Sequence, residues 1–392
     1  MKLKTIKQVV NHQLCIGCGL CAMDENVQME ISKGMIRPDR LIKNPMIEAS
    51  CPSKGYNLKK LGLHYFGDIN YSPELGYYRS LRLAHTLRDE FLQNASSGGM
   101  MTEIADSLLS KGLIDGVITT TFTYVNNTVR TESYIARTKQ ELINGQGSKY
   151  CPTSTLSILN KLVKNEKYLL IGTPCQIAGF RLYSQYNEHL KNQIPYTIAN
   201  FCGGYRDFKE LDYFVSNIAH IDEVKFFRHR GGGQPGSMKI EGENGKLFQY
   251  PYPDYAKLSP FVKNERCTLC MDAVGELADF SCGDAWLEER DKHAPWSIVI
   301  TRSKFAEDFL NGLASDLKIK YGENITDKQV VQSQKLNITS KKYRQYKRIK
   351  VRDFILHFSP EWNDNFPIKG GTYLSEIKII LSKAKAKLIK SQ

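Results

Sequence analysis

The sequence predicts an α/β fold, α+β overall, with a mostly parallel sheet between a small N-terminal module and a basic, helical C-terminal extension. Short apolar runs, each followed by a helix-forming stretch, recur from about residue 80 to residue 300. Closely spaced cysteines mark the start of the chain, and lysines crowd its end. We therefore divide it into units at 1–65, 80–300 and 301–392, with turn residues recurring at 67–78.

In the central region, predicted strands lead into turns and then helices. The strand at 167–172 is followed by Thr-Pro-Cys-Gln, and the strand at 196–201 by Cys-Gly-Gly. An apolar-periodic helix precedes the strand at 116–122. Parallel sheets bind ligands beyond the carboxyl ends of their strands, and Cys175 and Cys202 lie just past two such ends.

Composition indicates a globular protein without a membrane span. Hydrophobic residues make up 41% and charged residues 24% of the chain, as in ordinary globular domains. No apolar run approaches the roughly 20 residues that a span needs. The basic start lacks the apolar stretch of a secretory signal. We therefore expect a cytoplasmic protein.

The C-terminal extension carries most of the net charge. Residues 331–392 hold 14 Lys and Arg against four Asp and Glu, and the whole chain has a formal charge of +13. Such an end could contact an acidic protein, an anionic membrane surface or nucleic acid, or it could be a solvated tail. The predicted helix at 373–390 is amphipathic, and its apolar face comprises Leu374, Ile377, Leu381, Ala384 and Leu388.

Three N-terminal cysteines have the spacing of an iron–sulfur site. Cys15, Cys18 and Cys21 form C-x2-C-x2-C, which lets one short loop present three thiolates to three irons of a [4Fe–4S] cluster. Cys51, followed by a proline as in many ferredoxin modules, is the predicted fourth ligand. The alternative is zinc, which usually takes two separate C-x2-C pairs.

The remaining cysteines are scattered, and their spacing leaves several roles open. They are Cys151, Cys175, Cys202, Cys267, Cys270 and Cys282. The Cys267–Cys270 pair could be part of a second cluster, a zinc half-site or a redox dithiol. A lone cysteine after a strand could equally be a nucleophile or a buried thiol. Cys282 is a competing candidate for a ligand of the second cluster, and Cys151 has no evident partner.

Two turn segments have groups suited to a phosphate-bearing cofactor. Free N–H groups, hydroxyls and glycines at a helix start favour phosphate, although the same residues often serve only as a helix cap. Together the segments suggest a cradle for a flavin dinucleotide, formed by Asn94, Ser96, Ser97, Gly98, Gly99, Ser148, Lys149 and Tyr150. His229, in a basic, glycine-rich stretch, is a weak catalytic candidate against the alternative of a mobile surface loop. Asp284 is interpreted as structural.

The order of these motifs resembles the β-subunit family of the coenzyme F420 hydrogenases and dehydrogenases, which includes the 7-hydroxymethyl chlorophyll a reductases. The resemblance covers about residues 10–290 and rests on Asn94-Ala-Ser-Ser-Gly-Gly99, Gly147-Ser-Lys-Tyr150, Gly172-Thr-Pro-Cys-Gln176, Phe201-Cys202, Cys267-x-x-Cys270 and Gly283-Asp-Ala-Trp286.

The resemblance implies FAD and a second [4Fe–4S] cluster in the sheet domain, beside an added ferredoxin-like module. At the matching positions, the second cluster would be held by Cys175, Cys202, Cys267 and Cys270, and the two turn segments would face the flavin. The sequence departs from the family at Cys282, where another residue is common. It also has Gly203-Gly204 where a His or Glu often follows the cysteine.

The resulting hypothesis is a flavin-dependent reductase with two clusters. Electrons would come from a ferredoxin or a reduced deazaflavin coenzyme, and a small organic substrate would be reduced, as in cell-surface polysaccharide biosynthesis. The alternative is an electron-transfer subunit of a hydrogenase or dehydrogenase complex with no substrate of its own. A third class is a binding module that is stabilised by zinc or a cluster and contacts nucleic acid through its basic end. It is not expected, because aromatic residues are not interleaved with the basic residues. The basic C-terminus leaves peripheral membrane contact open.

Overall fold

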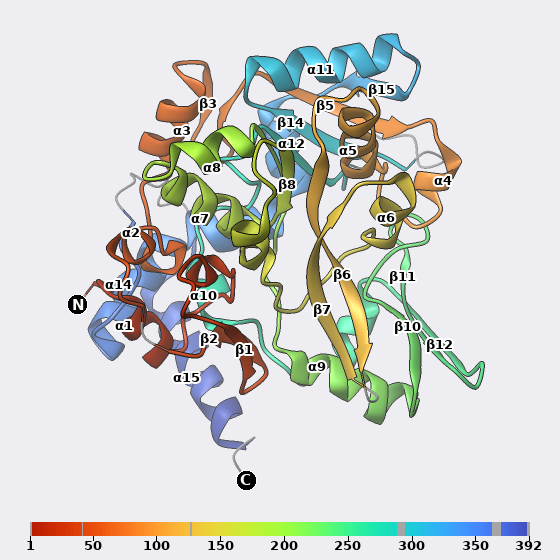
Figure 1. The fold of residues 1–392 in the computed structure, drawn as a ribbon. Helices are drawn as coiled ribbons and strands as arrows, with labels where there is room; N and C mark the ends of the chain where they lie inside the picture. The colour runs from red at the N-terminus through yellow and green to blue at the C-terminus, as the bar shows by residue number, and fades with distance from the viewer. Residues whose placement is uncertain (1, 41, 126–127, 288–294, 363–369, 390–392) are drawn as a thin grey trace.

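A sheet of eight strands forms the centre of the computed structural model, which describes residues 2–40, 42–125, 128–287, 295–362 and 370–389 (Figure 1). Strands β13, β9, β8 and β6 pair in parallel, and the outer pairings are antiparallel, so that five of these strands run in one direction. The predicted α/β class with a mostly parallel sheet is confirmed. In sheet order the strands are β15 (Ile319–Asn324), β5 (Ser80–Thr86), β14 (Ser297–Thr301), β13 (Phe280–Asp284), β9 (Tyr196–Asn200), β8 (Tyr168–Gly172), β6 (Gly116–Val125) and β7 (Thr128–Ala136).

Helices cover both faces of this sheet, because alternate residues of each buried strand point to opposite sides. On one face, Leu169 and Ile198 share an apolar core with α5 (Met100–Ser110) and α11 (Lys304–Ser315). On the other face, Leu170 and its neighbours pack against α7 and the N-terminal module. The helices beside these are α4 (Asp89–Leu92), α6 (Lys139–Asn144), α7 (Pro174–Ser184), α8 (Glu188–Gln193) and the 3-10 helix η3 (Thr155–Lys161).

The N-terminal module is made of short elements that share a core with the sheet. Its apolar side chains, Ile16 and Leu20 among them, pack with Tyr168 and Phe180 of the sheet domain. The turn-rich stretch at 67–78 forms the hairpin of β3 (Asn70–Ser72) and β4 (Gly76–Tyr78). The other elements are α1 (Ile6–Asn11), η1 (Leu20–Met23), β1 (Met29–Ser32), β2 (Met35–Pro38), α2 (Pro45–Ala49), η2 (Pro52–Lys54) and α3 (Leu58–Phe66).

A second, smaller sheet is inserted between β9 and β13. Its strands are antiparallel and share a core with the far end of the β6–β7 hairpin, where Val129 is buried. The loop between its first two strands carries His229 and Arg230. The elements of the insertion are α9 (Phe208–Tyr213), the π-helix η4 (Phe214–Ala219), β10 (Val224–Arg228), β11 (Ser237–Gly242), β12 (Leu247–Pro251), η5 (Asp254–Leu258) and α10 (Glu265–Thr268).

The C-terminal helices fold back onto the N-terminal module (Figure 1). Lys2 Nζ pairs with Asp353 at 2.7 Å, and the Glu361 N–H donates to the Lys54 carbonyl at 2.6 Å. The residues beyond 300 also supply β15 and α11 to the sheet domain. The helices of this end are α12 (Asp327–Ser333), α13 (Lys335–Ile338), the π-helix η6 (Thr339–Tyr343), α14 (Gln345–Leu356) and α15 (Tyr373–Ile389).

Several cations of this end, ahead of α15, are turned inward. Lys341, Lys342, Arg348 and Arg352 are all less than a tenth exposed. On α15, the predicted apolar residues Leu374 and Leu381 are each 61% exposed; the side chains of Ala384 and Leu388 lie outside the described ones. No helix in the described part of the chain is long and apolar enough to cross a membrane.

Candidate cluster and cofactor sites

The first cysteine group lies on a tightly turned loop that docks on the sheet domain. Gly17 and Gly19 adopt φ values of +66° and +95°, a conformation that glycine permits. A Cβ on Gly19 would lie 2.4 Å from the backbone nitrogen of Ser157. The N–H of Leu156 donates to the carbonyl of Cys18 at 2.8 Å. The two glycines therefore allow the cysteine loop to approach the backbone of η3 closely.

The thiols of this loop and Cys51 influence one another. Burial, followed by the charge of neighbouring cysteines, raises the pKa of Cys18 and Cys21. Burial also raises the pKa of Cys15 to about 11. Thiols in this state stay protonated at neutral pH, whereas a bound metal deprotonates them. The fold thus gathers the residues predicted from spacing, which are Cys15, Cys18, Cys21 and Cys51.

The second cysteine group lines one cavity. Cys175 stands in the first turn of α7, just after β8, and Cys202 lies two residues past the end of β9. Cys267 and Cys270 approach from α10 and the turn behind it. Burial and the charges of Cys270 and Cys202 raise the pKa of Cys175. The four residues that the resemblance named for one cluster therefore lie together at the carboxyl edge of the sheet.

The lining of this cavity suits an anionic cluster. Its other residues are Ile16, Thr173, Pro174, Tyr205, Arg266 and Lys341, with no carboxylate among them. Arg266 Nη1 is buried and has no hydrogen-bond partner within the described residues. Four thiols with two cations match the ligands and charge of a [4Fe–4S] cluster. In the described parts of the chain, no group of three or more His, Cys, Asp or Glu side chains is arranged to hold a single metal ion.

The two cysteine groups are neighbours, with Tyr205 between them. The Tyr205 hydroxyl donates to the carbonyl of Ile16 at 2.6 Å, and Ile16 follows Cys15 directly while also lining the second cavity. Burial, followed by the charges of cysteines from both groups, raises the pKa of Tyr205. Cys18 and Cys175 also interact electrostatically across this boundary.

The other two cysteines lie apart from both groups. Cys282 is on β13 and is buried in the apolar core beneath α5 and α11. Burial alone raises its pKa to about 12. Cys151 packs among the apolar residues of the inserted sheet. Neither residue lines the cavity, so the structure places Cys282 as a core residue rather than as a ligand.

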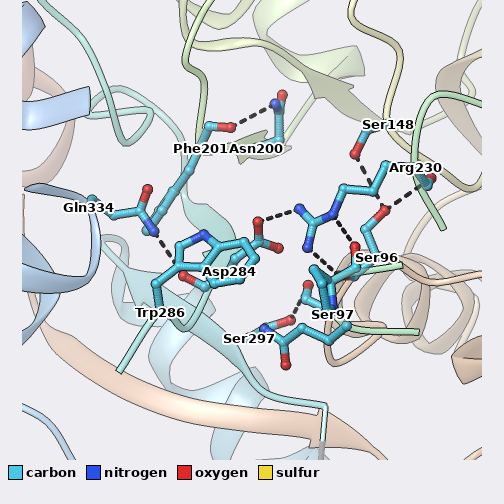
Figure 2. A network of polar contacts seen from close by, with 12 residues as sticks. Ser96, Ser97, Ser148, Asn200, Phe201, Arg230, Asp284, Trp286, Ser297 and Gln334 are labelled. Carbon is cyan, nitrogen blue, oxygen red and sulfur yellow. Dashed lines mark hydrogen bonds and ion pairs between the residues drawn. The ribbon is translucent and has the colours of Figure 1, made fainter. Parts of the chain in front are cut away.

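The two segments predicted to face a flavin, 94–99 and 148–150, meet at the carboxyl edge of the sheet (Figure 2). Ser96 Oγ lies 3.3 Å from Ser148 Oγ. Ser97 Oγ lies 3.0 Å from Ser297 Oγ, at the start of β14, and that oxygen also accepts the Gly98 N–H. Gly98 is required for packing as well, because a Cβ there would lie 2.6 Å from the carbonyl oxygen of Ala84.

Arg230 ties these segments to the end of β13 (Figure 2), and the sequence had not singled it out. Its side chain is 2% exposed. Nη2 donates to the carbonyl of Ser96 at 2.8 Å, and Nη1 pairs with Asp284. The guanidinium also lies 4.3 Å from the ring centre of Tyr252 and 5.3 Å from that of Trp286. The only signal in the sequence was the basic, glycine-rich loop.

Two other cofactor-binding candidates, Asn94 and Lys149, differ in their surroundings. Asn94 is exposed. Lys149 Nζ donates to the carbonyls of Gly145, Gln146 and Gly147, and burial lowers its pKa to about 8. In the structure this ammonium therefore stabilises the turn at 145–147 that precedes it in the chain.

His229 is fully buried rather than on a surface loop. Its ring lies beside those of Phe122, Phe227 and Tyr150. Nδ1 accepts the Tyr150 N–H at 3.3 Å, so the neutral ring carries its proton on Nε2. Within the part of the chain described, Nε2 has no partner. Burial lowers the pKa of His229 to about 3.

Comparisons with known proteins agree with this architecture. The family models described as coenzyme F420 hydrogenase/dehydrogenase, beta subunit, match at residues 83–160 for the N-terminal part and 165–327 for the C-terminal part. An uncharacterized protein of Methanocaldococcus jannaschii is 28% identical over 244 residues, which is 60% of this chain and 63% of that relative. The coenzyme F420 hydrogenase subunit beta of Methanococcus voltae is 25% identical over 249 residues, 60% of this chain and 81% of the relative.

One solved structure shares the fold. A chain of the F420-reducing [NiFe] hydrogenase complex from Methanosarcina barkeri superposes with a TM-score of 0.58 at 19% identity. The match covers 75% of this chain and 99% of that one. At this identity the likeness concerns the fold alone.

Proposed function

The chain belongs to the coenzyme F420 hydrogenase/dehydrogenase β-subunit family, and we propose that it is an electron-transfer subunit of a larger oxidoreductase. Relatives named as the β subunit of a hydrogenase, and a fold shared with a chain of a hydrogenase complex, support this role. They favour it over a free-standing reductase of a sugar or another small substrate. A partner protein would then supply or consume the electrons.

The observation that carries the proposal is the cavity lined by Cys175, Cys202, Cys267 and Cys270. These residues come from separate parts of the sequence, yet the fold brings them to one point at the carboxyl edge of the sheet. The first cysteine group lies beside them, across Tyr205. Two adjacent cysteine groups in one chain would hold two clusters close together, as electron transfer over short distances requires.

The protein's own residues would hold and orient the cofactors. When bound, [4Fe–4S] clusters would supply one-electron transfer, and FAD would join it to two-electron chemistry. The cysteines would provide the cluster ligands, and the buried loop around Gly17 and Gly19 would exclude water from the first of them. Ser96 and Ser148 would contact the flavin, and Arg230 would hold the Ser96 segment against Asp284.

The external donor would be either a reduced ferredoxin or a reduced deazaflavin coenzyme. The two are distinguished by mixing each of them anaerobically with the oxidised, cofactor-loaded chain and following the loss of visible absorbance. The donor that reduces the chain faster identifies the class of physiological electron donor. A chain that both donors leave oxidised would contradict the role.

The decisive measurement is anaerobic purification followed by counts of iron, sulfide and flavin. We expect about eight irons, about eight sulfides and one FAD per chain, as two [4Fe–4S] clusters require. Apart from exchange with its electron donor, the loaded chain alone should reduce no small organic substrate, whereas it should pass electrons to a co-purified partner. Zinc without flavin, or turnover of a sugar substrate by the isolated chain, would overturn the proposal.

A further inference from the structure

The second cysteine cavity is lined by two buried cations, and within the described ranges no carboxylate lines it beside them. Arg266 and Lys341 both line it, and their exposed fractions are 2% and 3%. Arg266 donates to the carbonyls of Pro52 and Ser53, next to Cys51. Lys341 Nζ donates to the carbonyl of Asp272 at 2.8 Å. Among the described residues neither cation forms an ion pair with a carboxylate, although each is withdrawn from water.

The other buried cations of the C-terminal extension differ from Lys341 in this respect. Lys342, the next residue, pairs with Glu276. Arg348 pairs with Glu376 at 2.9 Å, and Arg352 pairs with Glu265. These pairs show that the fold supplies carboxylates where it buries charge here. Because a buried charge without a partner is costly, the missing partner of Lys341 must be sought in the cavity it faces.

The cysteine thiolates are the groups placed to be that partner. The carbonyl of Asp272 that accepts the Lys341 ammonium also lies 3.4 Å from Cys270 Sγ. The ammonium and this sulfur therefore share one oxygen atom. The carboxylate of Asp272 raises the pKa of Lys341 less than Cys270, Cys202 and Cys267 do, and it accepts the N–H groups of the three residues at 274–276.

We propose that Lys341 supplies the positive charge that sets the reduction potential of the second cluster, so that the C-terminal extension is part of that site. The inference rests on the proposed function, because it requires a cluster in the cavity. A cluster held by four thiolates is anionic, and it gains one more negative charge on reduction. A fixed ammonium in a low-dielectric site stabilises the reduced form more than the oxidised form.

The cations that act on the first cysteine group, Arg37 and Lys54, are only partly buried, whereas Lys341 is 3% exposed. Arg266 reaches toward both groups, since it binds the Pro52 and Ser53 carbonyls while lining the second cavity. Lys341 contacts only the second. It should therefore raise the potential of the second cluster relative to the first, which favours electron flow inward from the N-terminal module. Lys341 lies beyond the matched family segment, 165–327, so this device belongs to the extension.

The test is a redox titration of the cofactor-loaded full chain, followed by electron paramagnetic resonance. In Lys341→Met, which keeps the length but not the charge, we expect the equilibrium constant for reducing the second cluster to fall at least about tenfold, or about 59 mV for a one-electron couple. Lys341→Arg should restore it. Lys335→Met, the same change at an exposed position of the same segment, should leave it unchanged, as should the first cluster's signal in all variants.

Iron counts separate the outcomes. If Lys341→Met loses the second cluster while Lys341→Arg keeps it, the need for a charge at this position is supported. Equal potentials in Lys341→Met and the parent chain would overturn the inference and leave the proposed function standing. Loss of the cluster in both variants alike would also overturn it, because packing rather than charge would then be the cause. A parent chain with no second cluster would overturn both.

Discussion

The two cysteine groups are built in opposite ways. Three members of the first group, Cys15, Cys18 and Cys21, lie on one loop of seven residues, and the fourth is 30 residues further on. The second group draws Cys175 from the start of a helix and Cys202 from the end of a strand. Its last two members follow a whole inserted sheet. The first group is therefore defined by a local loop, and the second exists only once the sheet has formed.

The difference also determines how a substitution in each group should affect cluster binding and the fold. A change in the first loop acts on its own conformation and on its docking surface. A change at one second-group cysteine should empty that cavity while the surrounding α/β core, held by its own apolar packing, persists. The variants below test these expectations, beginning with the largest effect.

Cys175→Ala should remove the second cluster and leave the first. We expect iron to fall from about eight to about four per chain, because a [4Fe–4S] cluster needs its four thiolates. The measurement is iron and sulfide analysis together with paramagnetic resonance of the reduced chain, which should retain one cluster signal.

Cys282→Ala is the matched control for that variant. Its thiol lies in the apolar core and not in the cavity, so iron should stay at about eight per chain. The free energy of unfolding should fall by about 1 kcal/mol for the buried sulfur that is lost. The ligand assignment would be wrong if Cys282→Ala lost half of the iron and Cys175→Ala lost none.

Gly19→Ala should disrupt the first group through its backbone. The residue has φ of +95°, and a Cβ would meet the backbone nitrogen of Ser157 at 2.4 Å. We expect about 3 kcal/mol or more of lost stability, from left-handed strain plus overpacking, and loss of the first cluster's iron. Denaturant unfolding and iron analysis measure the two effects.

Gly67→Ala separates strain from contact. Gly67 also has positive φ, +77°, but nothing lies within 4 Å of its Cβ position. Its ψ of −172° lies in a region that is essentially restricted to glycine, so the change should cost about 1–3 kcal/mol, but it should keep both clusters. Loss of the first cluster's iron in both variants would mean that close docking on Ser157 does not matter.

The sequence predicted the first group and the sheet because both depend on local patterns. The C-x2-C-x2-C spacing and the strand–turn–helix alternation are short-range signals. The second group could not be derived in this way, since spacing left Cys267 and Cys270 with several roles and left Cys282 in competition. Only the pairing of β13 beside β9 places the Cys282 side chain on the far face, in the apolar core.

The flavin segments and the basic extension show two further limits. Sequence named Ser96 and Ser148 but missed Arg230, because its partners, the Ser96 carbonyl and Asp284, lie more than 50 residues away in either direction. Likewise, a count of charges treats the C-terminal cations as surface. The structure pairs several of them with carboxylates elsewhere in the chain, such as the half-buried Glu265 and the buried Glu276, so net charge alone could not indicate a partner.

Tyr205→Phe tests the connection between the two groups and should have the smallest effect. The change removes the hydrogen bond to the Ile16 carbonyl while keeping the ring that separates the two sites. We expect about 1 kcal/mol of lost stability and both clusters retained. Because Ile16 adjoins Cys15, opening of the first loop should become about fivefold easier, and a chelator should remove the first cluster's iron faster by that factor.

Tyr65→Phe provides the comparison, since the Tyr65 hydroxyl also donates to a backbone carbonyl, that of Arg181, at 2.5 Å. It should lose similar stability without faster release of iron from the first group. If both variants release iron equally, the effect is one of global stability, and Tyr205 does not join the groups. If only Tyr205→Phe does, the local loop depends on the assembled site beside it, because the carbonyl that follows Cys15 is fixed by a residue that follows Cys202.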